Sequence, residues 1–195
     1  MAENLNFTGF NCKIKSKDKK KLLLQLKKIN KINWPPFLIS FKKKYQYSFD
    51  RKLIKKYINF KNINIVGIGG SALGTKAIYN FLFNKIKKKI NFLENPNFKK
   101  VNISKGLNII ISKSGNTLET VANANFALKT NNKNIFIVEK TNNYLSKLAN
   151  KLKCDVIEHK NFIGGRFSVL SEVGMLPSQL MGLNEAKFKQ FNSLI

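Results

Sequence analysis

The sequence predicts an α/β fold, with a mostly parallel, doubly wound sheet covered by helices on both faces and a mainly helical N-terminal leader before it. From about residue 62 onward, short apolar runs typical of buried strands alternate with helical patterns. Turns rich in glycine and serine join strands to helices at two places. Such alternation is typical of βαβ units, whose right-handed crossovers bring the strand-to-helix turns to one edge of the sheet.

The leader, residues 1–60, is expected to pack against a main domain of residues 61–195. Leucines on one side of a lysine-rich segment predict a basic amphipathic helix over 18–29, with Asp18 as its N-cap. Trp34-Pro35-Pro36 interrupts any helix, because proline lacks a backbone N–H and restricts the residue before it. A short helix is expected over 51–59.

In the main domain, β-branched and apolar runs predict strands, and the longer segments between them predict helices. The expected strands are 64–68, 90–93, 107–111, 134–138 and 155–158. The expected helices are 72–87, 117–128 and 144–151. Parallel strands buried on both faces read as nearly continuous apolar runs, as these do.

The net charge of +26 is the most unusual bulk property of the chain. Its lysines are scattered, and asparagine and isoleucine are also abundant, so we interpret the charge as compositional bias. Nucleic-acid binding by a lysine-rich surface is an alternative, but we expect neither a nucleic-acid nor a membrane partner. The positive field would help to attract a small phosphorylated substrate.

Three further features indicate the compartment. No apolar run approaches the roughly 18 residues of a membrane-spanning helix, and no secretory signal is expected near Met1. Cys12 and Cys154 are isolated, which suggests neither a disulfide framework nor a zinc site. A cytoplasmic location is therefore expected.

The first glycine-rich turn, Gly69-Gly70-Ser71-Ala72-Leu73-Gly74, directly follows a predicted strand. It exposes backbone N–H groups at the positive end of the next helix, which suits a phosphate, and Ser71 adds a hydroxyl. The sequence also satisfies the dinucleotide pattern G-x-G-x-x-A, with Glu94 one βα unit later. A nicotinamide site and a plain tight turn are therefore alternatives.

The second turn, Ser112-Lys113-Ser114-Gly115-Asn116-Thr117, places three hydroxyls before a helix that carries Glu119 in its first turn. Hydroxyls and unpaired helix N–H groups are donors that suit a phosphate dianion. A dinucleotide fold does not need this second turn, so the pair of turns favours a phosphomonoester. An ordinary N-cap at Thr117 is the alternative, but it needs only one hydroxyl.

The third motif, Gly164-Gly165-Arg166-Phe167-Ser168, presents an arginine after a pair of glycines. A guanidinium stays protonated and suits a carboxylate, a phosphate or a developing oxyanion. Apolar residues follow this motif, which disfavours a plain surface turn. His159, between Glu158 and Lys160, is expected to be a surface residue rather than a catalyst.

Together the three motifs resemble the glucose-6-phosphate isomerase family and stand in the family's order. The stretch GGRFSVLSEVGMLP at 164–177 is similar to a specific family signature, whereas the two turns alone indicate only a sugar-isomerase (SIS) domain. The resemblance covers residues 62–183. It implies an SIS-type fold and an enzyme of glycolysis and gluconeogenesis that interconverts glucose 6-phosphate and fructose 6-phosphate through an enediolate, without metal or organic cofactor.

The resemblance also implies roles for individual residues. Arg166 would stabilise the negative charge of the enediolate, and Glu119 would support the site by orienting other groups. The sugar phosphate would be bound by Gly70, Ser71, Ser112, Lys113 through its backbone, Ser114 and Thr117.

Members of this family are much longer than this chain. Their catalytic glutamate, and the histidine and lysine of ring opening, lie downstream of the Gly-Gly-Arg motif. We therefore expect the chain to correspond to the N-terminal portion, with the first of two SIS domains, and to be inactive alone. The intact protein is expected to be a homodimer acting on a sugar phosphate. The alternative is a non-catalytic SIS module that binds sugar phosphates, which would leave Arg166 unexplained.

Overall fold

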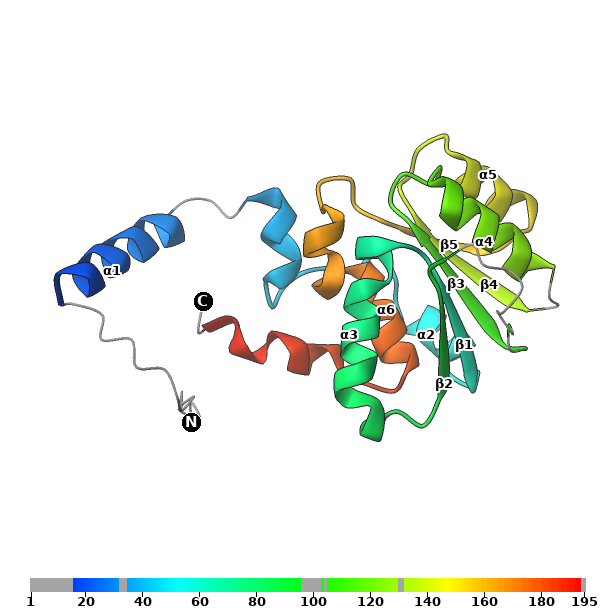
Figure 1. Ribbon diagram of the computed structural model, residues 1–195, viewed down its shortest axis with the longest axis horizontal. Coiled ribbons are helices and arrows are strands. Elements are labelled where there is room, and N and C mark those ends of the chain that lie inside the picture. Colours follow the sequence, from blue (N-terminus) through cyan, green and yellow to red (C-terminus); the bar gives the residue numbers. More distant parts are fainter. Residues whose placement is uncertain (1–15, 32–34, 96–102, 104, 130–131, 194–195) are drawn as a thin grey trace. The chain divides into compact units, whose positions relative to one another are not determined.

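The computed structural model describes residues 16–31, 35–95, 103, 105–129 and 132–193 (Figure 1). The chain divides into two compact units, Met1–Pro35 and Pro36–Ile195. The first contains helix α1 (Ser16–Lys31), which confirms the predicted helix. Asp18 lies in the first turn of α1 rather than at its N-cap, because the helix begins earlier than expected. Cys12 lies outside the described residues.

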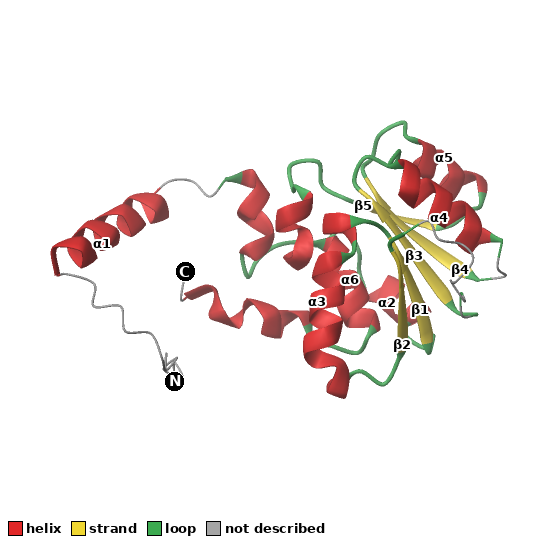
Figure 2. Ribbon diagram, in the orientation of Figure 1, coloured by secondary structure: helices red, strands yellow, loops and turns green. Residues whose placement is uncertain are grey.

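The second unit is built on a five-stranded parallel sheet of order β2-β1-β3-β4-β5 (Figure 2). Its strands confirm the five predicted ones and are β1 (Asn62–Val66), β2 (Lys89–Leu93), β3 (Leu107–Ser112), β4 (Lys133–Val138) and β5 (Asp155–Glu158). β1 and β3 are neighbours, and Val66 pairs with Ile110. The carboxyl ends of these two strands therefore lie side by side at one edge of the sheet.

Helices cover both faces of this sheet (Figure 1). On one face, residues such as Ile65 and Ile109 pack with Val173 and Leu176. On the other face, residues such as Ile110 and Phe136 pack with Ala124 and Leu145. The alternation of strand side chains divides the core in this way. The helices are α2 (Arg51–Tyr57), α3 (Leu73–Leu82), α4 (Leu118–Leu128), α5 (Tyr144–Lys151) and α6 (Glu172–Leu180).

Several elements differ from the sequence-based expectations. The helix expected over 72–87 ends at Leu82 and continues as the 3-10 segment η3 (Phe83–Lys85). Three further 3-10 segments, η1 (Pro36–Phe41), η4 (Gly165–Leu170) and η5 (Glu185–Ser193), were not predicted. Helix α6 was not predicted either. Almost all of its residues are buried, so it lacks the one-sided apolar periodicity that identifies a surface helix.

A row of asparagines crosses four strands at matching register positions. The Nδ2 of Asn91 donates to Oδ1 of Asn64 at 2.9 Å, and Asn64 donates in the same way to Asn108 at 2.8 Å. Asn108 in turn donates to Oδ1 of Asn134 at 2.8 Å. Asn64 and Asn108 are fully buried. A shift of one residue in strand register would break every one of these bonds, so the row specifies the alignment of β1 with β3.

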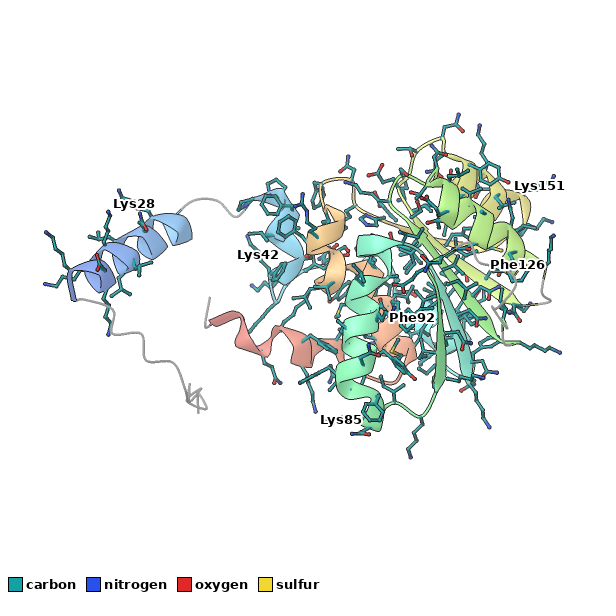
Figure 3. All side chains as sticks on the ribbon, viewed as in Figure 1. Lys28, Lys42, Lys85, Phe92, Phe126 and Lys151 are labelled. Carbon is teal, nitrogen blue, oxygen red and sulfur yellow. The ribbon has the colours of Figure 1, made fainter. Side chains whose placement is uncertain are left out.

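Lysines project from many different elements, including Lys28, Lys42, Lys85 and Lys151 (Figure 3). The positive charge is thus distributed along the chain rather than confined to one segment. Within the ranges that the structure describes, none of the helices combines the length and apolar content needed to cross a membrane.

Candidate functional site

The first two sequence motifs meet at the carboxyl edge of the sheet. The first turn folds as the 3-10 segment η2 (Gly69–Ser71), which begins three residues after the last residue of β1. The second turn begins at Ser112, the last residue of β3. A Cβ added at Gly67 would lie 2.9 Å from the carbonyl oxygen of Ile111 and 3.0 Å from Cβ of Ser71. Ser71 therefore lies above the junction of β1 and β3, next to the start of the second turn.

The hydroxyls of the second turn form a cluster in front of α4. Oγ1 of Thr117 lies 3.2 Å from Oγ of Ser112 and 3.4 Å from Oγ of Ser114. The backbone N–H of Gly115 donates to Oγ of Ser112 at 3.1 Å. Thr117 occupies the N-cap position of α4, but its side chain makes no capping hydrogen bond. Capping therefore does not explain this hydroxyl, and the first turn of α4 has no side-chain acceptor from its N-cap residue.

The start of α5 supports the second turn from outside. Gly115 has a φ of +66°, and a Cβ there would lie 1.9 Å from Oδ1 of Asn143, so only glycine fits. Oδ1 of Asn116 accepts a hydrogen bond from the backbone N–H of Tyr144 at 2.9 Å. These contacts hold the turn in one conformation. The backbone N–H of Leu145 also donates to the carbonyl oxygen of Gly115 at 3.1 Å, and no motif in the sequence indicated these contacts with α5.

Two charged residues of the predicted site flank the hydroxyl cluster. The carbonyl of Lys113 accepts a hydrogen bond from the backbone N–H of Glu139 at 3.1 Å. Its Nζ lies 3.7 Å from Oε1 of the same glutamate. Glu139 thus contacts both the backbone and the side chain of Lys113. Glu119 is exposed on the first turn of α4.

The third motif lies against the first. A Cβ added at Gly70 would lie 2.5 Å from the backbone of Gly165, so the two chain segments pass in direct contact. Oγ of Ser168 donates to the carbonyl oxygen of Gly165 at 2.8 Å and to that of Gly70 at 3.1 Å. Arg166 follows Gly165 and is exposed. Its guanidinium has no hydrogen-bond or ion-pair partner among the described residues, so it is available to a ligand.

The expectation that His159 lies at the surface is wrong. His159 follows β5 and is only 2% exposed. Its backbone N–H donates to the carbonyl of Val138 at 2.8 Å, and Nδ1 lies 3.2 Å from the carbonyl oxygen of Lys160. Burial lowers the pKa of His159, although the hydrogen bond to Lys160 opposes this shift. The charged neighbours in the sequence did not indicate exposure, because the tertiary fold decides burial at this position.

Glu172 lies within the signature stretch but was not among the residues predicted to form the site. This carboxylate is 1% exposed and accepts hydrogen bonds from the hydroxyl of Tyr45 and the backbone N–H of Ser48. A glutamate within an apolar stretch of the sequence could have indicated a buried charge, and a buried charge requires partners from elsewhere in the fold.

Glu94, the acidic residue that the dinucleotide alternative requires, directly follows β2. Its Oε2 lies 2.5 Å from Nζ of Lys76 on α3. Glu94 therefore has a partner within the fold, and this ion pair connects α3 to the sheet.

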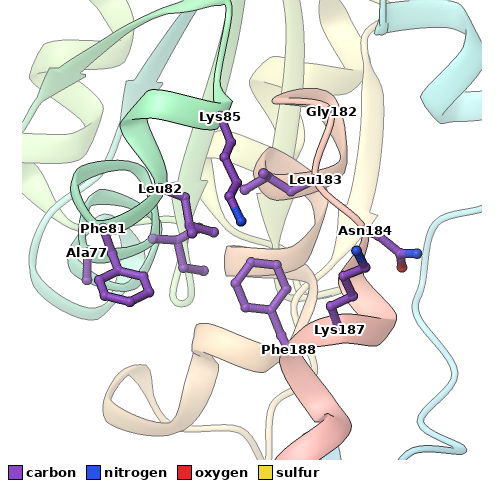
Figure 4. A pocket seen from close by; sticks show the side chains of 10 residues that line it. Ala77, Phe81, Leu82, Lys85, Gly182, Leu183, Asn184, Lys187 and Phe188 are labelled. Carbon is purple, nitrogen blue, oxygen red and sulfur yellow. The ribbon is translucent and has the colours of Figure 1, made fainter.

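A pocket of about 660 Å³ lies between α3 and the segment that includes η5 (Figure 4). Phe81, Leu82 and Phe188 give it an apolar lining, with Lys85 and Lys187 among the other lining residues. It lies at the opposite end of α3 from Ser71 and has no hydroxyl-bearing side chain in its lining. It is therefore separate from the place where the three motifs meet. Among the described residues, no group of three or more His, Cys, Asp or Glu side chains is arranged to hold a metal ion.

Comparisons with solved structures agree with the fold. A hypothetical protein from Thermus thermophilus aligns with a TM-score of 0.67 and 21% identity, covering 91% of this chain and 48% of that one. Tagatose-6-phosphate ketose/aldose isomerase from Escherichia coli aligns with a TM-score of 0.51 and 16% identity, covering 87% of this chain and 46% of that one. The predicted parallel α/β fold is confirmed.

Comparisons of sequence identify the family. Glucose-6-phosphate isomerase of Methanocaldococcus jannaschii is 32% identical over 160 residues, which cover 71% of this chain and 38% of that protein. Glucose-6-phosphate isomerase of Borreliella afzelii is 39% identical over 138 residues, which cover 60% of this chain and 26% of that protein. The chain thus spans well under half the length of these relatives. A family model described as Phosphoglucose isomerase matches residues 52–194, and the chain belongs to that family.

Proposed function

We propose that the intact protein is a glucose-6-phosphate isomerase, which interconverts glucose 6-phosphate and fructose 6-phosphate through an enediolate. The observation that carries this proposal is the meeting of three motifs at one place. Ser71 lies above the β1–β3 junction, the hydroxyls of the second turn cluster beside it, and Gly165 contacts Gly70. Membership of the phosphoglucose isomerase family supports the same conclusion.

In this proposal the two turns bind the phosphate of the substrate. The hydroxyls of Ser71, Ser112, Ser114 and Thr117 donate to the phosphate oxygens, together with the backbone N–H groups at Gly70, Lys113 and the start of α4. The absence of a side-chain cap on α3 and α4 supports this role, because the phosphate would then be the acceptor for their first N–H groups. We infer that this phosphate contact orients the sugar toward Arg166.

Arg166 then stabilises the charge that develops at the reacting end of the sugar. Isomerisation moves a proton between C2 and C1, and negative charge develops on the oxygens of the enediolate. A guanidinium placed beside these oxygens stabilises the charge as it forms. Glu119, on the first turn of α4, has a supporting role and orients neighbouring groups rather than transferring the proton.

We further propose that these 195 residues bind the sugar phosphate but do not isomerise it appreciably. The glutamate that transfers the proton in the family lies downstream of the Gly-Gly-Arg motif, and we assign that role to none of the residues of the candidate site. General acid–base catalysis contributes about 10²–10⁴-fold to such a reaction. The domain assignment is part of the same proposal, with residues 61–195 as an SIS domain and residues 1–60 as a leader that packs on it. For the intact protein we propose a cytoplasmic homodimer.

Binding measurements test this function directly. The chain is titrated by calorimetry with glucose 6-phosphate, inorganic phosphate and glucose, and its turnover is followed in a coupled assay. Binding of both phosphates but not of glucose, with Ser71→Ala weakening both, is the expected result. Near-normal turnover would contradict the assignment of the proton-transfer step to a downstream glutamate. Equal affinity of the wild type and Ser71→Ala for both phosphates would overturn the phosphate site.

A non-catalytic SIS module that only binds sugar phosphates is the second candidate, and Arg166 distinguishes the two. A five-carbon aldonic acid phosphate carries a carboxylate where the enediolate carries its charge. If Arg166 serves catalysis, Arg166→Ala should weaken binding of this compound and leave the affinity for inorganic phosphate unchanged. Unchanged affinity for both compounds would favour the binding module.

A further inference from the structure

A buried carboxylate lies at the base of the loop that carries Arg166. This loop runs from Lys160, just after β5, to Glu172, the first residue of α6. Glu172 is 1% exposed, and its Oε1 lies 4.0 Å from Nζ of Lys160. The two ends of the loop are therefore in electrostatic contact.

Tyr45 contacts both ends of the loop. Its hydroxyl lies 2.8 Å from Oε2 and 3.0 Å from Oε1 of Glu172 and donates to this carboxylate. Nζ of Lys160 lies 4.2 Å from the centroid of the Tyr45 ring. The same ammonium donates to the carbonyl of Gln46 at 2.7 Å. The segment around Tyr45 thus joins the beginning of the loop to its end.

Ser48 completes the set of donors to the buried carboxylate. Its backbone N–H donates to Oε1 of Glu172 at 2.9 Å, and its Oγ lies 3.2 Å from the same oxygen. Burial, followed by the charge of Glu172, raises the pKa of Tyr45 well above its usual range. The phenol therefore remains a proton donor at any pH at which the protein functions.

The upper part of the loop contacts the segment η1. Phe167 packs its ring 4.5 Å from that of Phe37, and its carbonyl oxygen lies 3.5 Å from Oγ of Ser40. Arg166, one residue earlier, is exposed and has no partner among the described residues. No hydrogen bond or ion pair among the described residues fixes its guanidinium, so the backbone of the loop sets the point from which this side chain extends.

A buried charged network contributes little net stability, because its groups lose their hydration on folding. Desolvating a carboxylate costs several kcal/mol, and well-packed apolar residues often give equal or greater stability. The directional hydrogen bonds around Glu172 instead select one geometry, which apolar packing does less strictly. This favours a role in placing the loop over a role in stability alone.

We propose that Tyr45 and Glu172 are positioning residues, which hold the base of the loop so that Arg166 meets the charge that develops on the substrate. This inference rests on the proposed role of Arg166. In this proposal, stabilisation of the transition state depends on two further residues, Tyr45 and Glu172, which lie outside the phosphate-binding turns.

The test compares Tyr45→Phe with a matched control, Tyr47→Phe. Both changes remove one phenolic oxygen from neighbouring tyrosines whose ring centroids are 5.1 Å apart. The hydroxyl of Tyr47 is buried and has no hydrogen-bond partner among the described residues, whereas that of Tyr45 donates to Glu172. The wild type, Arg166→Ala and both tyrosine variants are titrated with inorganic phosphate and with the five-carbon aldonic acid phosphate. Circular dichroism checks that each variant is folded.

Tyr45→Phe is expected to lower the affinity for the aldonic acid phosphate roughly 5- to 30-fold and to leave the affinity for inorganic phosphate unchanged. Tyr47→Phe should change neither affinity. An equal loss for both ligands in Tyr45→Phe, or no loss, would overturn the positioning role. If Tyr45→Phe does not fold, Ser48→Ala takes its place and should show a smaller loss with the same ligand selectivity.

The design separates this inference from the function on which it rests. If Arg166→Ala weakens binding of the aldonic acid phosphate and Tyr45→Phe does not, the positioning role of Tyr45 and Glu172 is refuted, while the role of Arg166 stands. If the wild type binds neither ligand, or if Arg166→Ala changes nothing, the role of Arg166 fails and the positioning role fails with it.

Discussion

The backbones of Gly70 and Gly165 touch at the carboxyl edge of the sheet. A Cβ added at Gly70 would lie 2.5 Å from Cα and from the carbonyl carbon of Gly165. Gly70 belongs to the turn that we assign to phosphate binding, and Gly165 immediately precedes Arg166. The contact therefore sets how far the proposed phosphate site lies from the proposed charge-stabilising group.

Gly70→Ala is predicted to disrupt this contact. The added methyl group meets rigid backbone, so the two segments must move apart, and overpacking of this kind costs about 1–3 kcal/mol. Urea denaturation should show that loss of unfolding free energy, and calorimetry should show weaker phosphate binding. Gly165→Ala is the matched control, because its Cβ would lie 3.4 Å from Cα of Gly70, at the limit of ordinary contact. Equal effects of the two substitutions would contradict the steric explanation.

Thr117→Ala is predicted to weaken phosphate binding without destabilising the protein. Loss of one hydroxyl donor to an anion costs about 1–3 kcal/mol, or roughly 5- to 150-fold in Kd. Thermal stability should change little, because the Thr117 side chain makes no capping bond to α4. Thr117→Ser retains the hydroxyl and should bind phosphate as the wild type does. A large fall in melting temperature for Thr117→Ala, with unchanged affinity, would favour the capping explanation instead.

Asn108→Ala is predicted to destabilise the fold strongly. It leaves the Nδ2 groups of Asn64 and Asn132 without this acceptor, and an unsatisfied buried polar group costs about 1–3 kcal/mol. Urea denaturation measures the effect. Asn91→Ala is the comparison: Asn91 belongs to the same row but lies on the edge strand β2 and is only half-buried, and its loss removes one donor to Oδ1 of Asn64. An equal loss for Asn91→Ala and Asn108→Ala would show that burial of the substituted side chain itself does not decide the cost.

The buried His159 is predicted to make stability depend on pH below neutrality. Burial places the pKa of His159 in the folded state below its ordinary value of 6.5. The unfolded chain therefore binds the proton more readily, and the free energy of unfolding should fall as pH drops through and below 6.5. Above that value the imidazole is neutral in both states and contributes no pH dependence.

Denaturation of the wild type and of His159→Gln between pH 5 and 7.5 tests this sign. The substitution should flatten the pH profile, because His159 is the single histidine of the chain. A profile as steep in the variant as in the wild type would show that other groups cause the dependence.

The sequence by itself determined the parallel α/β fold and supplied the residues that we propose for the site. The strands were predictable because buried parallel strands are rich in apolar residues, as in the run Ile109-Ile110-Ile111 of β3. The three motifs were predictable because glycine and hydroxyl residues are concentrated between a strand and a helix. Even the meeting of the two turns followed from chain order, since right-handed crossovers place strand-to-helix turns at the same edge.

Only the tertiary structure decided which polar groups are buried and what they contact. Glu172 and His159 appear in the sequence among ordinary neighbours, yet both are almost completely enclosed. Tyr45 and Glu172 are far apart in the chain, and no local pattern links them. Helix α6 is buried nearly all round and therefore shows no amphipathic period. Local sequence specifies backbone conformation and which faces are apolar, whereas contacts between distant segments depend on how complete elements pack together.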